Sequence, residues 1–158
     1  MEETPWLDDE QLRAWKRFVA VVEQLPGILD SQLQQDSDLN HFEYYVLAML
    51  SEAPGRTLRM TALAERTNAT LPRLSHVVAR LEKRGYIERE RSAEDKRATN
   101  AVLTDAGWQK TVAAAPGHVR AVHDHVIAPL SREQIAQLDA IATAILGRIA
   151  PDRPLPEA

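Results

Sequence analysis

The sequence contains no cysteine and no long apolar run. The absence of cysteine excludes disulfides, thiolate nucleophiles, thiol redox switches and metal sites with cysteine ligands. No window approaches the roughly 18 uninterrupted apolar residues that a membrane span requires, and residues 1–5 are acidic where a signal peptide would be basic. We therefore expect a cytoplasmic protein with no membrane partner.

Charge is unevenly distributed along the 158 residues, whose net charge is -4. Residues 55–100 hold eleven basic and six acidic residues, a net charge of +5, whereas the rest of the chain holds eight basic and seventeen acidic residues, a net of -9. A basic centre between acidic flanks suits a polyanionic partner such as nucleic acid. A solvated surface on which charges happen to cluster would explain the same numbers.

Helical periodicity dominates both ends of the chain. Asp8 and Asp9 stand at N-cap positions, and Pro26-Gly27 interrupts the apolar pattern that follows, which predicts a kinked or broken helix over residues 8–35. Near the other end, Thr104 caps a helix that is predicted to break at Pro116-Gly117. Ser131 then starts a final helix whose narrow apolar seam favours packing against another helix; the seam consists of Ile135, Leu138, Ala142, Ile145 and Ile149.

The middle of the chain predicts two short helices and a hairpin. After a helix that starts at Asn40 and ends before Pro54, a helix over residues 60–67 is followed by a tight turn and a helix over residues 71–84, capped by Thr70. Gly85 ends that helix in the left-handed conformation. Alternating segments on either side of a polar tip then predict a β-hairpin over residues 86–103. The predicted fold class is mostly α (α+β), a winged helix-turn-helix.

The helix over residues 71–84 is the candidate recognition helix. The major groove of B-DNA admits one helix, and only the exposed face near its N-terminus reaches base edges. On that face we expect Arg73 and His76 to contact base edges and Thr70 and Ser75 to contact phosphate or base. Arg80 and Lys83 are expected to contact backbone phosphates.

Several motifs in register resemble the MarR family of transcriptional regulators. They are the Leu63-Ala64-Glu65 start of the scaffold helix, the run over residues 80–87, the Asp95-Lys96-Arg97 tip and the Val102–Gly107 exit from the hairpin. The resemblance implies a homodimer that binds double-stranded DNA at a pseudo-palindromic operator. It also implies that Arg97 enters the minor groove and that Asp95 holds the tip by an ion pair or hydrogen bond. Family members often carry a second arginine beside the tip arginine; here Lys96 stands next to Arg97, and we expect it to contact DNA more weakly. A narrow minor groove attracts guanidinium groups, in agreement with this role for Arg97.

The resemblance also predicts how the chain is organised. Residues 1–39 and 104–150 would form the dimerisation region, residues 40–103 the DNA-binding domain and residues 151–158 a flexible tail. The predicted dimerisation residues are Leu12, Trp15, Val19, Leu138, Ala142, Ile145 and Ile149. The family's members are most often repressors that respond to ligands, so a small aromatic ligand is one candidate effector.

Other functions have weaker support. A winged-helix adaptor that binds protein in place of DNA is the alternative, since the flanks are acidic. No Ser-His-Asp elbow, Gly-rich phosphate loop or pair of catalytic carboxylates indicates an enzyme, and we expect no cofactor. We expect no metal site either: on a helix His123 and His125 diverge by about 200°, and His118 lies too far from His125 to chelate with it alone. For Trp6, Trp15 and Trp108 we favour packing in the core or in a dimer interface over contact with a ligand. For His41, Tyr44 and Tyr45 we likewise favour packing over ligand contact.

Overall fold

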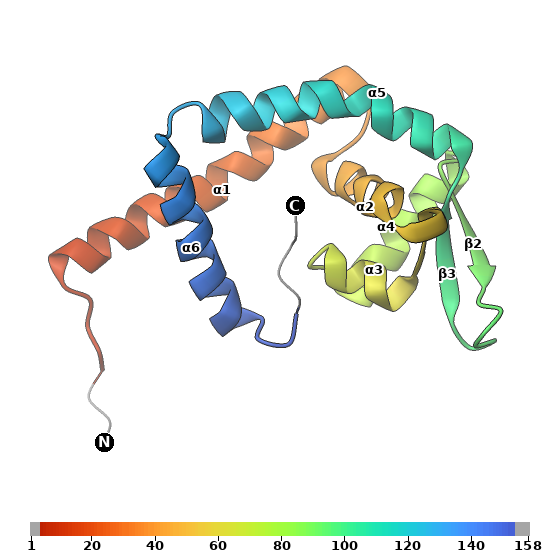
Figure 1. Ribbon diagram of the computed structural model, residues 1–158, viewed down its shortest axis with the longest axis horizontal. Coiled ribbons are helices and arrows are strands. Elements are labelled where there is room, and N and C mark those ends of the chain that lie inside the picture. The colour runs from red at the N-terminus through yellow and green to blue at the C-terminus, as the bar shows by residue number, and fades with distance from the viewer. Residues whose placement is uncertain (1–3, 154–158) are drawn as a thin grey trace.

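The computed structural model describes residues 4–153, which form a largely helical chain with one small antiparallel sheet (Figure 1). This confirms the predicted fold class. The elements in chain order are α1 (Asp9–Ser37), α2 (His41–Glu52), the 3-10 turn η1 (Pro54–Arg56), β1 (Thr57–Arg59), α3 (Met60–Arg66), α4 (Leu71–Lys83), β2 (Ile87–Arg91), β3 (Thr99–Leu103), α5 (Asp105–Val122), the π-helical turn η2 (His123–Ile127) and α6 (Arg132–Ile149).

The longer helices begin where their capping residues predict. Each of the five cap side chains accepts a hydrogen bond from the backbone N–H three residues further on, which satisfies one donor that the first turn leaves without a partner. These residues are Asp8, Asn40, Thr70, Thr104 and Ser131. At its other end α4 stops because Gly85 adopts a φ of 76°, as expected for a left-handed C-terminal residue.

The predicted break at Pro116-Gly117 is wrong, and of the two expectations for Pro26-Gly27, a kinked or a broken helix, the broken helix is wrong. Helix α1 runs through Pro26-Gly27 and α5 runs through Pro116-Gly117 without interruption. Each proline deprives the carbonyl four residues earlier of its helical donor, but those residues, Val22 and Val112, are exposed, so water can take the place of the lost N–H. The two helices also pack along one another, which offsets the loss.

The hydrophobic core lies in the lobe formed by α2, α3, α4 and the sheet. Its central side chains are fully buried and include Leu47, Leu50, Leu63, Leu74, Val78, Leu81 and Ile87. The sheet has the order β1-β3-β2, with both neighbours antiparallel to β3. Because α4 packs on this core through Leu74, Val77, Val78 and Leu81, its opposite face is left exposed.

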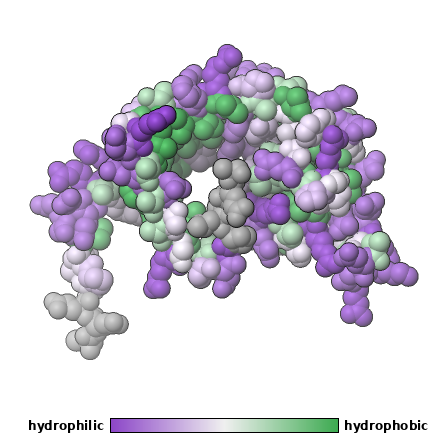
Figure 2. Space-filling view, viewed as in Figure 1, coloured by the Kyte–Doolittle hydropathy of each residue, from purple (hydrophilic) through white to green (hydrophobic). Residues whose placement is uncertain are grey.

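The helices outside this lobe form an arch that leaves apolar side chains uncovered. Helices α1 and α5 lie side by side and α6 descends from their far end (Figure 1). Helix α6 has no buried residue, and apolar atoms follow the inner rim of the arch (Figure 2). Within residues 4–153, no helix combines the length and apolar composition needed to cross a membrane. Of the predicted tail, residues 151–153 form a turn and the remainder lies outside the described residues.

Candidate nucleic-acid interface

The turn between α3 and α4 is built from local hydrogen bonds. Asn68 takes a positive φ of 53°, and the Ala69 N–H donates to the carbonyl of Ala64 at 2.9 Å. The Thr67 hydroxyl, which is buried, donates to the carbonyl of Leu63 at 2.7 Å. These hydrogen bonds give partners to backbone carbonyls in the last turn of α3 and direct the chain into Thr70, the cap of α4. The two helices therefore form a helix-turn-helix.

The first turns of α4 present polar side chains to solvent. Arg73 and His76 are exposed and Ser75 is partly exposed, as expected for residues on the outer face of a recognition helix. The guanidinium carbon of Arg73 lies 4.1 Å from the centroid of the Phe42 ring, a cation–π contact that restricts where this cation can lie. Lys83 is exposed at the opposite end of α4, more than two turns from Arg73.

The tip of the hairpin is held by its own short polar side chains. Asp95 accepts a hydrogen bond from the backbone N–H of Arg97 at 3.0 Å, which is one of the two ways in which it was expected to hold the tip. The buried Ser92 hydroxyl oxygen accepts from the N–H groups of Glu94 and Asp95. The side chains of Lys96 and Arg97 are left exposed at the end of the hairpin.

A groove of about 260 Å³ joins the recognition helix to the hairpin. Leu71 and Ser75 of α4 line one side, and Arg97 of the tip lines the other. The recognition helix and the tip arginine therefore face a common groove. Two cations that the sequence interpretation did not select, Arg59 and Arg89, line it as well. Both belong to the basic stretch over residues 55–100, and this was the only sequence signal that could have indicated them.

The hairpin is fastened to α4 by a two-pronged ion pair. Arg89 donates from Nε and Nη2 to Oε2 of Glu82 at 3.0 and 2.7 Å, and its backbone N–H donates to Oε1 at 3.1 Å. These hydrogen bonds from Arg89 lower the pKa of the Glu82 carboxyl against a smaller opposing effect of burial. Arg59 forms a looser pair with Glu94 at 3.4 Å. Charged groups beside the groove thus join the hairpin to α4 and its tip to β1.

Arg80 lies apart from this groove. Its Nη2 is 3.1 Å from Oε1 of the buried Glu43 at the start of α2. The phosphate contact expected of Arg80 remains a prediction, and in the free protein this guanidinium has an acidic partner.

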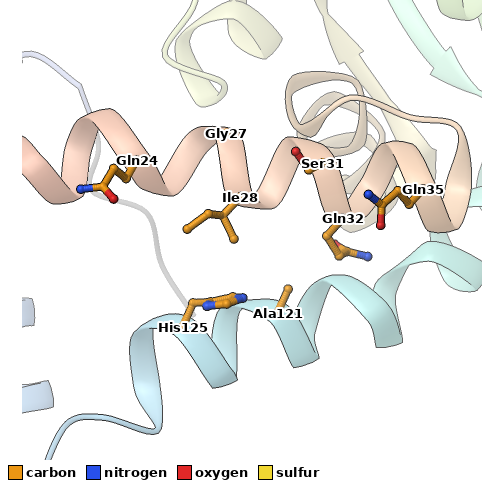
Figure 3. Close-up of a pocket in the computed structure, with 8 residues that line it drawn as sticks. All are labelled: Gln24, Gly27, Ile28, Ser31, Gln32, Gln35, Ala121 and His125. Carbon is orange, nitrogen blue, oxygen red and sulfur yellow. The ribbon is translucent and has the colours of Figure 1, made fainter.

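A second groove, of about 570 Å³, lies between α1 and α5 (Figure 3). Its lining combines amide, hydroxyl and imidazole groups with small apolar groups, and it includes no lysine or arginine. The lining residues are Gln24, Gly27, Ile28, Ser31, Gln32, Gln35, Ala121 and His125. Oε1 of Gln32 is buried without a hydrogen-bond partner among the described residues. A small molecule with hydrogen-bonding groups would match this lining.

Three aromatic and imidazole rings pack together where α2 meets α5. The His118 ring lies 4.5 Å from that of Tyr44 and 5.7 Å from that of His41, measured between centroids. Burial lowers the pKa of the His118 imidazole, and the neighbouring His41 lowers it further. Burial likewise lowers the pKa of His41 and raises those of Tyr44 and Tyr45. The packing expected of His41 and Tyr44 is what these contacts describe.

Trp6, Trp15 and Trp108 are all exposed within this chain, so the core is not where they pack, and the dimer interface, the other packing expected of them, remains a prediction. Trp108 lies under the Arg56 guanidinium, whose carbon is 4.2 Å from the ring. Across residues 4–153, no three His, Asp or Glu side chains gather in a way that could hold a metal ion.

The arrangement of two short helices, a hairpin with Lys96 and Arg97 exposed at its tip and a joining groove defines a winged helix-turn-helix protein. A profile of the MarR family matches residues 37–98. The chain is similar to Sco3205 of Streptomyces coelicolor, a MarR family regulator solved in complex with DNA, with 40% identity and a TM-score of 0.92 over 96% of this chain and 95% of that one. It is also 34% identical to the transcriptional regulator HosA of Escherichia coli over 61% of this chain and 70% of HosA. The match to the regulator YdcH of Bacillus subtilis, 36% identical, covers 50% of this chain and spans only 55% of the length of YdcH.

The chain belongs to the MarR family and is a transcriptional regulator of that family. This confirms the resemblance found in the motifs around Gly85 and the hairpin tip.

Proposed function

We propose that the protein binds double-stranded DNA as a homodimer, with α4 in the major groove and the hairpin tip in the minor groove of each half-site. The observation that supports this most directly is the shared groove, in which Ser75 of α4 faces Arg97 of the tip. One side of the protein can then follow the DNA from one groove into the next. The relative Sco3205, which was solved in complex with DNA, supports the same function.

The homodimer follows from the uncovered apolar faces of α1 and α6. Leu138 is 43% exposed and Ile149 is 70% exposed, although both lie on the narrow seam of α6. In α1, Leu12 and Trp15 are exposed as well. A contiguous apolar surface of this kind is costly in water and marks an interface. A second copy of the chain would cover both helices and place two recognition helices about one helical turn of DNA, near 34 Å, apart.

DNA binding is tested by titrating the purified protein with the DNA upstream of its own gene at several salt concentrations. If the proposal is right, the logarithm of the affinity falls steeply and linearly with the logarithm of the salt concentration. Arg73→Ala and Arg97→Ala should each weaken binding by about 1–3 kcal/mol, and Arg73→Ala should also relax base preference. Arg132→Ala, which removes an exposed cation at the start of α6, is the matched control.

Two results would contradict this proposal. Equal affinities of the parent, Arg73→Ala and Arg97→Ala across all salt concentrations would show that neither the recognition helix nor the hairpin tip contacts DNA through these arginines. A shallow salt dependence would favour the winged-helix adaptor, because a protein partner does not release the counterions that phosphate contacts displace.

We further propose that the protein is a cytoplasmic repressor that a small molecule releases from DNA. The groove between α1 and α5 supports this, because a ligand there would change how the helices that carry the dimer pack together. Its lining offers hydrogen-bonding groups but no lysine or arginine, so it fits a neutral aromatic or polar molecule better than an anion. To test this proposal, the protein–DNA complex is titrated with such compounds, once with the parent and once with Ile28→Trp. The tryptophan would fill the groove, so the compounds should release the parent from DNA but not the variant. Release that is unchanged by Ile28→Trp would place the ligand elsewhere.

A further inference from the structure

Glu43, in the first turn of α2, is the only buried acidic side chain within residues 4–153 and is 6% exposed. Part of its surroundings is the helix cap. The Asn40 N–H donates to Oε2 of Glu43 at 3.0 Å, and the Glu43 N–H donates back to Oδ1 of Asn40 at 2.8 Å. A cap of this kind forms on exposed helices as well, so it does not explain why the carboxylate is buried.

The burial is explained by two arginines from the recognition helix. Nη2 of Arg80 lies 3.1 Å from Oε1 of Glu43, and Nη1 of Arg84, at the C-cap of α4, lies 3.7 Å from Oε2. The C-terminal half of α4 is therefore attached to the start of α2 by charged groups that share one carboxylate.

Arg84 extends this link to α1. Its Nη2 donates to the backbone carbonyl of Asp38 at 2.7 Å and to the Asp38 carboxylate at 3.2 Å. Asp38 is the C-cap of α1 and adopts the left-handed conformation, with a φ of 49°. The face of Tyr86 lies 5.1 Å from the Arg84 guanidinium carbon and limits its movement. One guanidinium thus joins the end of α1 to the end of α4.

The buried charge of Glu43 destabilises orientations of α4 in which its arginine partners move away. Removing a carboxylate from water costs free energy, and that cost is offset only while its cationic partners stay in place. Any rotation of α4 that withdraws Arg80 and Arg84 would leave Glu43 buried and uncompensated. An apolar contact would tolerate sliding, whereas this contact favours one orientation.

We infer that Glu43 is a positioning residue that fixes the orientation of α4 relative to α1. Helix α1 carries the proposed dimerisation face, so the link would set the separation of the two recognition helices on DNA; this consequence rests on the proposed function. Glu43 acts through Arg80 and Arg84 and does not itself contact DNA.

The orientation is measured directly by electron paramagnetic resonance distances within one chain. The absence of native cysteine allows clean labelling, so spin labels are placed at Arg17→Cys on α1 and Lys83→Cys on α4, both exposed positions. The labelled protein is diluted with an excess of unlabelled protein so that only distances within a chain contribute. The measurement is made with and without Glu43→Gln, which keeps an acceptor for the cap but removes the charge.

The expected result is a shift or broadening of the distance distribution in Glu43→Gln. Arg84→Gln removes the partly exposed guanidinium of the same link and should produce the same change. This variant replaces Glu43→Gln in the test if Glu43→Gln folds poorly. Glu65→Gln, on the exposed face of α3, should leave the distribution unchanged. Unchanged distributions in both Glu43→Gln and Arg84→Gln would overturn the inference.

A DNA measurement separates this inference from the proposed function. A duplex selected by the parent protein from random-sequence DNA is compared with one whose two halves are moved apart by one base pair. The parent should discriminate between them, and Glu43→Gln should lose part of that discrimination. If the parent selects no DNA, the proposed function fails while the distance measurement still decides the role of Glu43. If the distances change but discrimination does not, the link to half-site spacing is wrong.

Discussion

At the scale of single residues, Gly107 shows how closely the chain is packed where the hairpin leads into α5. A Cβ at this position would lie 2.6 Å from Cδ1 of Leu103 and closer still to the carbonyl oxygen of Tyr86. The second of these neighbours is backbone and cannot move aside. The close approach of β3, the end of α4 and α5 therefore requires the absence of a side chain.

Gly107→Ala should lower the free energy of unfolding by about 1–3 kcal/mol, the usual range for overpacking, although alanine is the better helix former. Gly147→Ala in α6 is the matched control, because nothing lies within 4 Å of its Cβ position. There the helix preference should dominate and stabilise the protein by about 0.5–1 kcal/mol. Chemical denaturation of both variants checks these values. A Gly107→Ala variant as stable as the parent would show that the packing can relax.

The buried imidazoles predict how stability depends on pH. Nδ1 of His118 is buried without a hydrogen-bond partner among the described residues, and burial lowers the pKa of this ring and of His41. Below about pH 6.5 the unfolded chain binds protons that the folded protein does not, so the free energy of unfolding falls as the pH drops from there toward the lowered pKa values. Above that pH both states are neutral and the effect vanishes.

His118→Phe should reduce this loss, since it keeps a ring beside Tyr44 and removes the proton site. Denaturation of the parent and variant between about pH 5.5 and 7.5, above the range in which carboxylates titrate, checks this. His76→Phe, at an exposed position on α4, should keep the slope of the parent. Identical slopes for the parent and His118→Phe would show that this ring does not resist protonation.

At the scale of secondary-structure elements, the hairpin is joined to α4 through Glu82 and Arg89. The pair is partly exposed, so its net contribution is about 0.2–1 kcal/mol, with the two-pronged geometry favouring the upper end. Its effect is local, because the Arg89 N–H itself donates to Glu82.

Glu82→Ala should therefore speed hydrogen exchange at the Arg89 amide by up to about fivefold, the equivalent of 1 kcal/mol. Nuclear magnetic resonance measures that rate. Glu90→Ala, on an exposed side chain of the same strand, is the control. Equal exchange rates in Glu82→Ala and the parent would show that the contact with Glu82 does not hold β2 against α4.

The elements themselves were largely predictable, and the errors have a physical cause. Capping residues such as Asn40 and Thr104, together with Gly85, act within one turn, so their neighbours in the sequence suffice to locate helix ends. Pro116 was expected to break its helix, and Pro26 to kink or break its own, because proline costs a helix one hydrogen bond. What outweighs that cost is the packing of α1 against α5, two segments about ninety residues apart in the sequence, and a local pattern carries no information about it.

At the scale of the whole molecule, the apolar seam of α6 predicts the oligomeric state. Leu138→Asp would place a charge where the proposed partner copy packs, which is costly in a desolvated interface. The variant should sediment as a monomer at concentrations at which the parent is a dimer. Ala140→Asp, on the opposite exposed face of α6, should leave the dimer intact. A parent that sediments as a monomer, or a dimer that tolerates Leu138→Asp, would contradict the proposed interface.

In the candidate site, too, some features could be predicted from the local sequence and others depend on tertiary packing. The local order of residues was enough to indicate a helix with an exposed polar face after Thr70 and a hairpin whose tip carries Arg97, because caps, turns and periodicity act over a few residues. The partners of individual charged groups were not foreseeable, since these groups meet only when distant segments pack. Burial of Glu43 between Arg80 and Arg84, and the entry of Arg59 and Arg89 into the groove beside Arg97, depend on how α2, α4 and the sheet share one core.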